Sequence, residues 1–199
     1  MKKKNIMFIS ASVLCLVIIT ACTIGIININ AKKDSEPDYD TVTMSGSYAA
    51  VLADEIDDIA DVVVKATVTQ KGDPFMPDLS IPQKYAPPDY TPRTDYTLNV
   101  TEVYKGEPER EIIVRVAGGE YDGIMYKYDR DPNLQVGKEY ILFLLNGEQY
   151  VKDENDVHYE IIAISAGCFE VADDGSIIDN GLIEGDFNDL LEFLNMPQS

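Results

Sequence analysis

The sequence contains little cysteine. Only three of its 199 residues are cysteines, and two of these, Cys15 and Cys22, lie in an apolar N-terminal segment. The rest of the chain has a single thiol, Cys168, so no internal disulfide framework can form there. A domain built from residues 34–199 must therefore be held together by its hydrophobic core.

Histidine is nearly absent as well. The single residue, His158, excludes a zinc site with several histidines, and the chain has no HExxH or GxSxG motif. Its acidic neighbours predict an exposed polar position at the start of a strand. A nucleophilic pair of His158 with Cys168 is the alternative and would support a hydrolase. Because Cys168 lies among apolar strand residues, we expect a small buried side chain there and no enzymatic activity.

Positive charge is scarce beyond the first 33 residues. The chain has 16 basic and 35 acidic residues, and residues 1–33 hold five of the lysines and none of the acids. Residues 34–199 therefore carry 35 acids against 11 bases, a formal charge near −24. This excess argues against binding a nucleic-acid backbone or lying flat on an anionic membrane. It favours solubility and is compatible with divalent cations or a basic partner.

What the N-terminus does contain is a long apolar run. The run follows a lysine triplet and includes 22 mostly apolar residues from Ile6 to Ile27. As a helix it would span about 33 Å, enough to cross a bilayer core of roughly 30 Å. The leading lysines predict a cytoplasmic N-terminus and an exported remainder. We therefore expect a signal or membrane anchor over residues 1–33, with the domain on the extracytoplasmic face of the cell membrane of a Gram-positive bacterium.

The type of anchor stays open at Cys22. Ile19-Thr20-Ala21-Cys22 resembles a bacterial lipobox, in which the cysteine becomes the lipidated first residue. The residues that follow Cys22 remain apolar, whereas a lipoprotein normally continues with a polar tether. Three alternatives remain: an uncleaved transmembrane helix, a lipid on Cys22, and cleavage near Ala31. All three place residues 34–199 outside the cytoplasm.

One strand, over residues 94–106, organises the predicted fold. Its apolar side chains alternate at Tyr96, Leu98 and Val100, which is the period of a strand with one buried face. The next apolar residue is Val103, so the phase slips between Val100 and Val103. Such a slip predicts a bulge that bends the strand, as a small closed barrel requires.

The remaining pattern predicts a mainly β (α+β) domain over residues 47–196, after a polar tether over residues 34–46. Further strands are expected over 61–70, 111–116, 140–145, 150–152, 159–165, 168–171 and 176–178. Helices are expected at the two ends, over 47–60 and 186–196, the second capped by Asp186. About seven strands without βαβ alternation favour a small OB-like barrel.

The first expected helix has an acidic side. Opposite its apolar stripe lie Asp54, Asp57, Asp58 and Asp61. A solvated face is the simple interpretation, and a site for a cation or a basic partner is the alternative.

The order of these strands resembles that of the netrin-like module. The matching stretches are Ala60 to Val68, Tyr96 to Gly106 and Val136 to Leu145. That module is an OB-type barrel found in tissue inhibitors of metalloproteinases and related extracellular proteins. The inhibitors use a free N-terminal cysteine to bind the protease zinc, and here no cysteine except Cys22 precedes the first strand. The resemblance therefore implies the fold and not protease inhibition.

Two long connections carry the candidate contact residues. Residues 71–93 hold six of the ten prolines, which exclude a continuous helix or strand, and residues 117–133 are rich in tyrosine. Aromatic side chains on long loops are typical of binding surfaces. Residues 71–93 are too apolar for a pure linker, so we expect them to pack partly on the barrel, either as a structural flap or as a contact surface. The candidate partner or ligand contacts are Phe75, Met76, Tyr85, Tyr90, Tyr121, Tyr126 and Tyr128.

A calcium site is the one cofactor the residues suggest. Asp129, Asp131 and Asn133 have the spacing of the first ligands of a calcium-binding loop. The sixth position is Leu134 instead of glycine and the twelfth is Tyr140 instead of glutamate, so an EF-hand is excluded. A looser calcium site remains as a hypothesis.

Together these features predict a membrane-tethered, extracytoplasmic binding domain for a protein or a basic ligand. The alternatives are a hydrolase built on Cys168 and His158, and a purely structural envelope protein. No feature indicates nucleic-acid binding.

Overall fold

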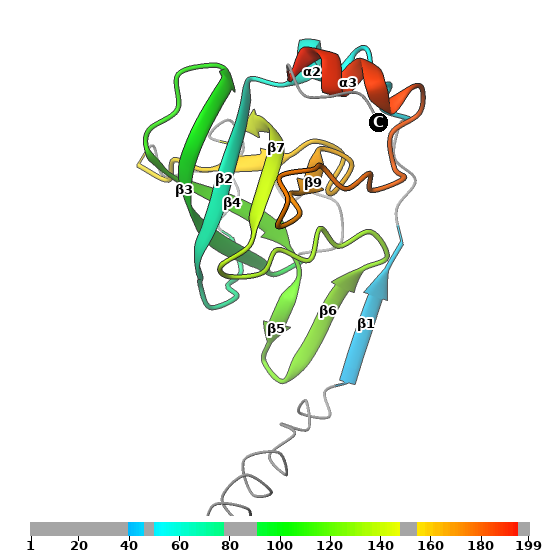
Figure 1. The fold of residues 1–199 in the computed structure, drawn as a ribbon. Helices are drawn as coiled ribbons and strands as arrows, with labels where there is room; N and C mark the ends of the chain where they lie inside the picture. Colours follow the sequence, from blue (N-terminus) through cyan, green and yellow to red (C-terminus); the bar gives the residue numbers. More distant parts are fainter. Residues whose placement is uncertain (1–39, 46–49, 78–90, 148–154, 195–199) are drawn as a thin grey trace, which may run out of the picture. The chain divides into compact units, whose positions relative to one another are not determined.

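The computed structural model describes residues 40–45, 50–77, 91–147 and 155–194. Over these ranges the chain forms nine strands and two helices, and five of the strands close into a barrel (Figure 1). The barrel strands pair in the order β2-β3-β4-β8-β7 and back to β2. Their bounds are β2 Val62–Lys71, β3 Arg93–Lys105, β4 Glu111–Ala117, β7 Glu139–Asn146 and β8 Tyr159–Ile161.

This pairing confirms the expected mainly β barrel. Strands β4 and β8 run parallel, whereas every other pair in the barrel is antiparallel. A five-stranded closed sheet of this kind is consistent with an OB-like barrel. The strand count differs from the expected seven, because β1 (Asp40–Met44), β5 (Gly119–Tyr121), β6 (Ile124–Tyr128) and β9 (Cys168–Glu170) lie outside the closed barrel.

The bulge expected in β3 is confirmed. Val100 and Glu102 pair with the consecutive β2 residues Ala66 and Lys65, which leaves Thr101 without a partner in the register. The Thr101 hydroxyl donates a hydrogen bond to the Lys65 carbonyl (3.1 Å) and so occupies the irregular position. A bulge of this type bends a strand and increases its twist.

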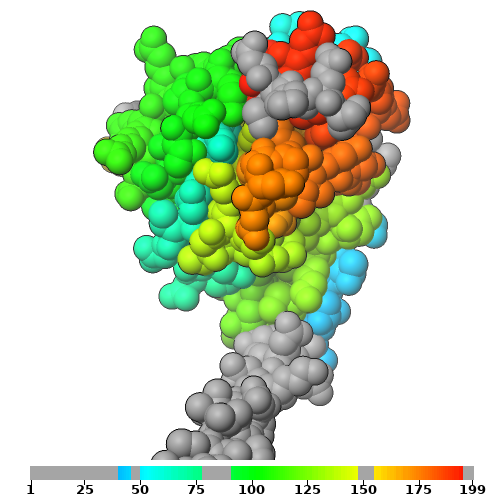
Figure 2. Space-filling view, in the orientation of Figure 1, coloured from blue at the N-terminus to red at the C-terminus, as the bar shows by residue number. Residues whose placement is uncertain are grey.

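The barrel wall is buried on both faces where β2 and β7 meet. One cluster of side chains fills the barrel and includes Val64, Leu142 and Cys168. A second cluster lies outside and is covered by the C-terminal segment, with the Phe143 and Phe169 rings packed edge to face at 6.0 Å. In the space-filling view the segment after β8 (orange) and the C-terminal helix (red) cover this side (Figure 2).

Both helices are shorter than expected. Helix α3 spans Phe187–Phe193 and begins as predicted, with the Asp186 side chain accepting a hydrogen bond from the Asn188 amide. Helix α2 spans only Ile56–Ile59, in place of the helix expected over 47–60. The backbone before this helix is extended and hydrogen-bonds to a distant residue. The Ala53 amide donates to the Glu184 carbonyl, and the Glu184 amide donates to the Val51 carbonyl. This extended bridge takes the place of helical hydrogen bonds at residues 51–53, and residues 47–49 of the expected helix lie outside the described part of the chain.

Two segments expected to be irregular contain strands. Residues 40–44 of the expected tether form β1, and the expected long connection 117–133 contains the hairpin β5–β6. The hairpin turns at Asp122-Gly123, both with positive φ (53° and 76°), as a two-residue type I′ turn requires. β1 pairs in parallel with β6, giving a three-stranded sheet in the order β1-β6-β5 (Figure 1).

The chain leaves the barrel for this sheet at Gly118-Gly119. The buried hydroxyl of Thr94 donates to the Gly118 carbonyl at 2.7 Å. A Cβ atom at Gly119 would lie 2.6 Å from the Thr94 hydroxyl oxygen, and its φ of 125° also disfavours other residues. The glycine pair therefore allows the hairpin to start directly against the barrel.

The expected membrane anchor over 1–33 and the return strand over 150–152 lie outside the described residues. Over the ranges that are described, no helix is both long and apolar enough to span a membrane.

The turn expected at Asp173-Gly175 is present, and Ile177 forms only an isolated bridge to Val171 where a strand over 176–178 was expected.

Candidate functional site

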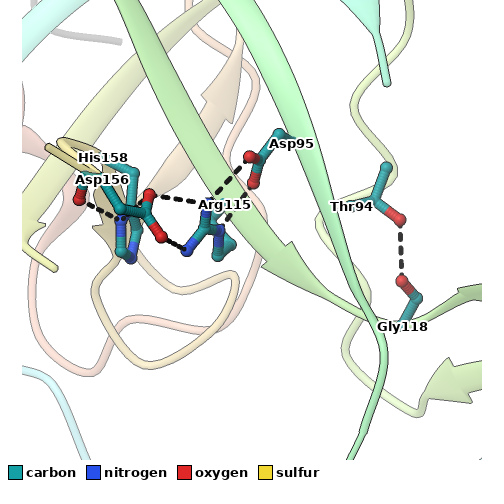
Figure 3. Close-up of polar contacts among 6 residues, drawn as sticks. All are labelled: Thr94, Asp95, Arg115, Gly118, Asp156 and His158. Atoms are coloured by element: carbon teal, nitrogen blue, oxygen red, sulfur yellow. Dashed lines mark hydrogen bonds and ion pairs between the residues drawn. The ribbon is translucent and has the colours of Figure 1, made fainter. Parts of the chain in front are cut away.

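A buried arginine occupies the outer face of the β3–β4–β8 wall. Arg115 faces Asp95 across the β3–β4 ladder and Glu160 across the β4–β8 ladder. Its guanidinium donates to both oxygens of Asp95 (2.7 and 2.9 Å) and to both oxygens of Asp156 (2.9 and 2.9 Å) (Figure 3). The Arg115 side chain is only 6% exposed. One guanidinium thus joins two strands and the segment that leads into β8.

The surroundings of Arg115 keep it charged. The Phe75 ring lies over the guanidinium, 4.8 Å from the ring centroid to Cζ. Burial alone would lower the pKa of Arg115, but the hydrogen bonds to Asp95 and Asp156 outweigh it and raise that pKa. The hydrogen bonds from Arg115 also hold the pKa of Asp156 below its usual value. Four of the five N–H donors of the guanidinium are engaged by these carboxylates.

His158 is buried, which corrects the expectation of an exposed polar residue. Its side chain is 2% exposed, and Nδ1 lies 3.3 Å from both the backbone oxygen and Oδ1 of Asp156 (Figure 3). The ring packs against Gly147, where a Cβ atom would lie 2.4 Å from Nε2. The local sequence around His158 gave no sign of this contact, because Gly147 comes from the end of β7.

A pocket of about 260 Å³ opens beside this cluster. The parallel pairing of β4 with β8 covers only Val114 with Tyr159 and Arg115 with Glu160, while β4 continues to Ala117. The pocket forms where β8 ends and the wall is therefore one strand narrower. Its lining residues are Arg93, Arg115, Val116, Ala117, Tyr128, Glu160, Ile161 and Ile164.

The turn that ends β8 is strained at the pocket wall. Ala163 and Ile164 both have positive φ (48° and 66°). For Ile164, a β-branched residue, this conformation is a genuine outlier. The Ser165 amide donates to the Ala163 carbonyl at 2.7 Å and closes a three-residue turn on Ile164, an arrangement that is rare and strained at positive φ. The strand expected over 159–165 stops at Ile161 because of this turn. Strain of this kind concentrates at functional sites.

The three-stranded sheet has one aromatic face. Residues in register lie on the same face of a sheet, so β6 presents Ile124, Tyr126 and Tyr128 together. The register adds Val42 and Met44 from β1 and Tyr121 from β5 to this face. Val42 is 43% exposed and Tyr121 36% exposed. We call these six residues the aromatic face, and Tyr128 also lines the pocket.

The predicted contact residues fall into three groups. Tyr121, Tyr126 and Tyr128 are brought together on the aromatic face, although on a hairpin instead of a loop. Phe75 covers Arg115, and Met76 is exposed beside it in the chain. Tyr85 and Tyr90 lie outside the described residues, as does Cys22.

The candidate calcium ligands form a turn. The Asn133 amide donates to Oδ1 of Asp131 (2.8 Å), Asn133 has positive φ, and the Asp129 amide donates to the Met44 carbonyl. Over the described parts of the chain, no group of three or more His, Cys, Asp or Glu side chains is arranged to hold a metal ion. The calcium hypothesis gains no support from this geometry.

Cys168 lies inside the barrel, as expected for a small buried side chain. Burial raises the pKa of its thiol to about 12, so the thiolate needed for nucleophilic attack is disfavoured. Among the described residues, the polar contacts of the His158 ring are with Asp156 and not with Cys168. The expected Cys168–His158 pair is therefore not formed by these contacts.

Sequence reasoning missed Arg115, Arg93 and the two partner aspartates. A signal was present, because Arg115 is the one charged residue inside the apolar run of β4. Its partners could not be read from the sequence, since Asp95 and Asp156 lie 20 and 41 residues away. No protein-family model and no curated protein matches this chain.

Proposed function

We propose that this chain is a membrane-tethered, extracytoplasmic binding domain whose partner docks on the aromatic face. We also propose that its barrel is of the OB type found in the netrin-like module. The strand order β2-β3-β4-β8-β7 with one parallel pair supports the second statement. The aromatic face supports the proposal that this chain is a binding domain.

The composition of this face is typical of a protein interface. Tyrosine and methionine are enriched at the centres of interfaces and lysine and glutamate are depleted there. The aromatic face carries three tyrosines and a methionine, and the register adds only one charged residue, Asp40, on that side. The opposite face of the same sheet carries Thr41, Thr43, Glu120, Met125 and Lys127. Aromatic side chains that are left partly exposed on a sheet outside the core favour a partner of the chain over a structural role.

Site-specific photo-crosslinking tests this proposal. A photoreactive residue is placed at Val42 or, as the matched control, at Thr43, in cells that produce the full chain. The two positions are adjacent on β1, both are exposed, and they lie on opposite faces. We expect one protein to be captured from Val42 and not from Thr43. Capture that is equal from both positions, or absent from Val42, would overturn the proposal and favour a structural envelope protein.

The anchor is tested separately. We propose that the N-terminal segment remains as an uncleaved transmembrane helix. Cys22→Ala should then leave the chain in the membrane fraction, and the wild-type chain should take up no fatty-acid label. Labelling that Cys22→Ala abolishes would instead identify a lipoprotein.

A further inference from the structure

We propose that the pocket beside Arg115 binds a free amino acid with an apolar side chain, held by its carboxylate at Arg93 and its ammonium group at Glu160. The inference does not depend on the partner of the aromatic face, because that face shares only Tyr128 with the pocket and does not include Arg93 or Glu160. A failure of the crosslinking experiment would leave it standing.

The register places the two charged groups on opposite sides of strand β4. Arg93 is in register with Ala117, and Glu160 is in register with Arg115, two residues earlier on β4. All four therefore lie on the outer face of the wall. Arg93 and Glu160 are two strands apart and offset by two residues along the strands, so their Cα atoms are about 11–12 Å apart at the usual spacings, and both have long side chains. Ala117 lies beside Arg93 on this face, and its small side chain is part of the pocket lining.

The charges of the pocket are complementary to a zwitterion. The Arg115 charge is shared by Asp95 and Asp156, so it is not available to a ligand. Over the described part of the chain, no carboxylate is within ion-pair distance of the Arg93 guanidinium, although acids outnumber bases by 35 to 16. Arg93 can therefore bind a carboxylate through two parallel hydrogen bonds. Glu160 provides the opposite charge in the same pocket.

Ligands with a single kind of charge fit less well. Asp95, Asp156 and Glu160 together outweigh Arg93 and Arg115 by one negative charge, which disfavours a doubly charged phosphate. A simple cation such as a polyamine would meet the uncompensated charge of Arg93. An amino acid has no net charge and offers one group to each residue.

The rest of the lining favours a small, partly apolar molecule. Ala117 and Ile164 contribute apolar surface, Ile164 from its strained turn, while the Val116 and Ile161 side chains belong to the barrel core. The volume of about 260 Å³ is below the roughly 300–1,000 Å³ of pockets for drug-sized ligands. The hydroxyl of Tyr128 lies 3.3 Å from that of Thr91 and is held at the pocket edge.

The test compares L-leucine with three analogues by calorimetric titration of the full chain in detergent micelles. L-leucinamide lacks the carboxylate, N-acetyl-L-leucine lacks the ammonium group and resembles a peptide C-terminus, and inorganic phosphate is a plain anion. We expect saturable binding of L-leucine, about 10-fold or more tighter than of each analogue, as the loss of one charge-assisted hydrogen bond predicts. Equal binding of N-acetyl-L-leucine, binding of phosphate alone, or binding of none of the four compounds would each overturn the proposal.

Variants assign each charge to its residue. In Arg93→Gln, L-leucine and L-leucinamide should bind with equally low affinity. In Glu160→Gln, L-leucine and N-acetyl-L-leucine should bind with equally low affinity. The matched control Arg110→Gln removes an exposed arginine outside the pocket and should change nothing. Ala117→Leu should fill part of the pocket and abolish binding while the thermal transition of the chain is retained. If Arg93→Gln and Arg110→Gln bind L-leucine alike, Arg93 is not the carboxylate site.

Discussion

Both carboxylate oxygens of Asp156 lie 2.9 Å from guanidinium nitrogens of Arg115, 41 residues earlier in the chain. This contact fastens the segment that leads into β8 onto β4, beside their short parallel pairing. Asp95 completes the arrangement from β3. Three segments of the wall therefore depend on a single side chain.

Removing the Arg115 side chain should lower the free energy of unfolding of the domain. Arg115→Ala leaves Asp95 and Asp156 close together without a counter-charge, and breaking a buried pair costs about 3–5 kcal/mol. Because the two aspartates are partly exposed, we expect a loss of about 2–3 kcal/mol in the free energy of unfolding, measured by urea denaturation. Arg110→Ala, an exposed arginine, should change that free energy by less than about 0.5 kcal/mol. Equal effects of the two variants would contradict the structural role of Arg115.

The stability of the domain should fall in acid partly because of Asp156. The hydrogen bonds from Arg115 lower the pKa of Asp156 in the folded state below the usual 3.8. The unfolded chain therefore takes up this proton first, and the contribution is complete above pH 3.8 and is lost as pH falls through the folded-state pKa. Thermal melts between pH 7 and pH 2 should show a shallower acid-side decline for Asp156→Asn than for wild type. Parallel profiles would show that Asp156 is not linked to folding.

Gly147 should tolerate no side chain while His158 is present. A Cβ atom at Gly147 would lie 2.4 Å from Nε2 of His158, so Gly147→Ala should destabilise the fold by about 1–3 kcal/mol through overpacking. In a His158→Ala background the same change should cost much less. A double-mutant cycle by chemical denaturation measures this coupling. Additive effects of the two changes would mean that the residues do not meet.

The strained turn after β8 should prefer glycine. Ala163 has a φ of 48°, a conformation that costs about 1–2 kcal/mol for residues other than glycine. Ala163→Gly removes this strain, whereas Ala172→Gly only adds backbone freedom to the unfolded chain. We expect the free energy of unfolding of Ala163→Gly to exceed that of Ala172→Gly by about 1 kcal/mol. The reverse order in thermal or urea unfolding would contradict the turn geometry.

The parts of the fold that were predicted are those encoded by local patterns. The period of two along β3, its slip at Thr101 and the Asp186 cap each involve side chains that are neighbours in sequence. β1 was not predicted, because five largely exposed residues form a strand there only through pairing with β6, about 80 residues later. The hairpin turn at Asp122-Gly123 did carry a local signal, which the surrounding tyrosines and glycines obscured.

The candidate site was predicted less well than the fold. Tyr121, Tyr126 and Tyr128 were chosen for their residue type, and their common face follows only from the register of β5, β6 and β1. The environment of Arg115 depends on three segments far apart in the chain. Such clusters are set by tertiary contacts, which periodicity and spacing do not reveal.

The parallel pairing of β1 with β6 has a mechanical consequence. Five pairs, from Asp40 with Ile124 to Met44 with Tyr128, run along the length of β1. A tensile force along β1, applied from the N-terminal side, would act on these pairs in shear, so that they resist together and do not open one after another. The segment that joins the domain to its N-terminal part is therefore also the element that would transmit tension to the hairpin carrying the three tyrosines.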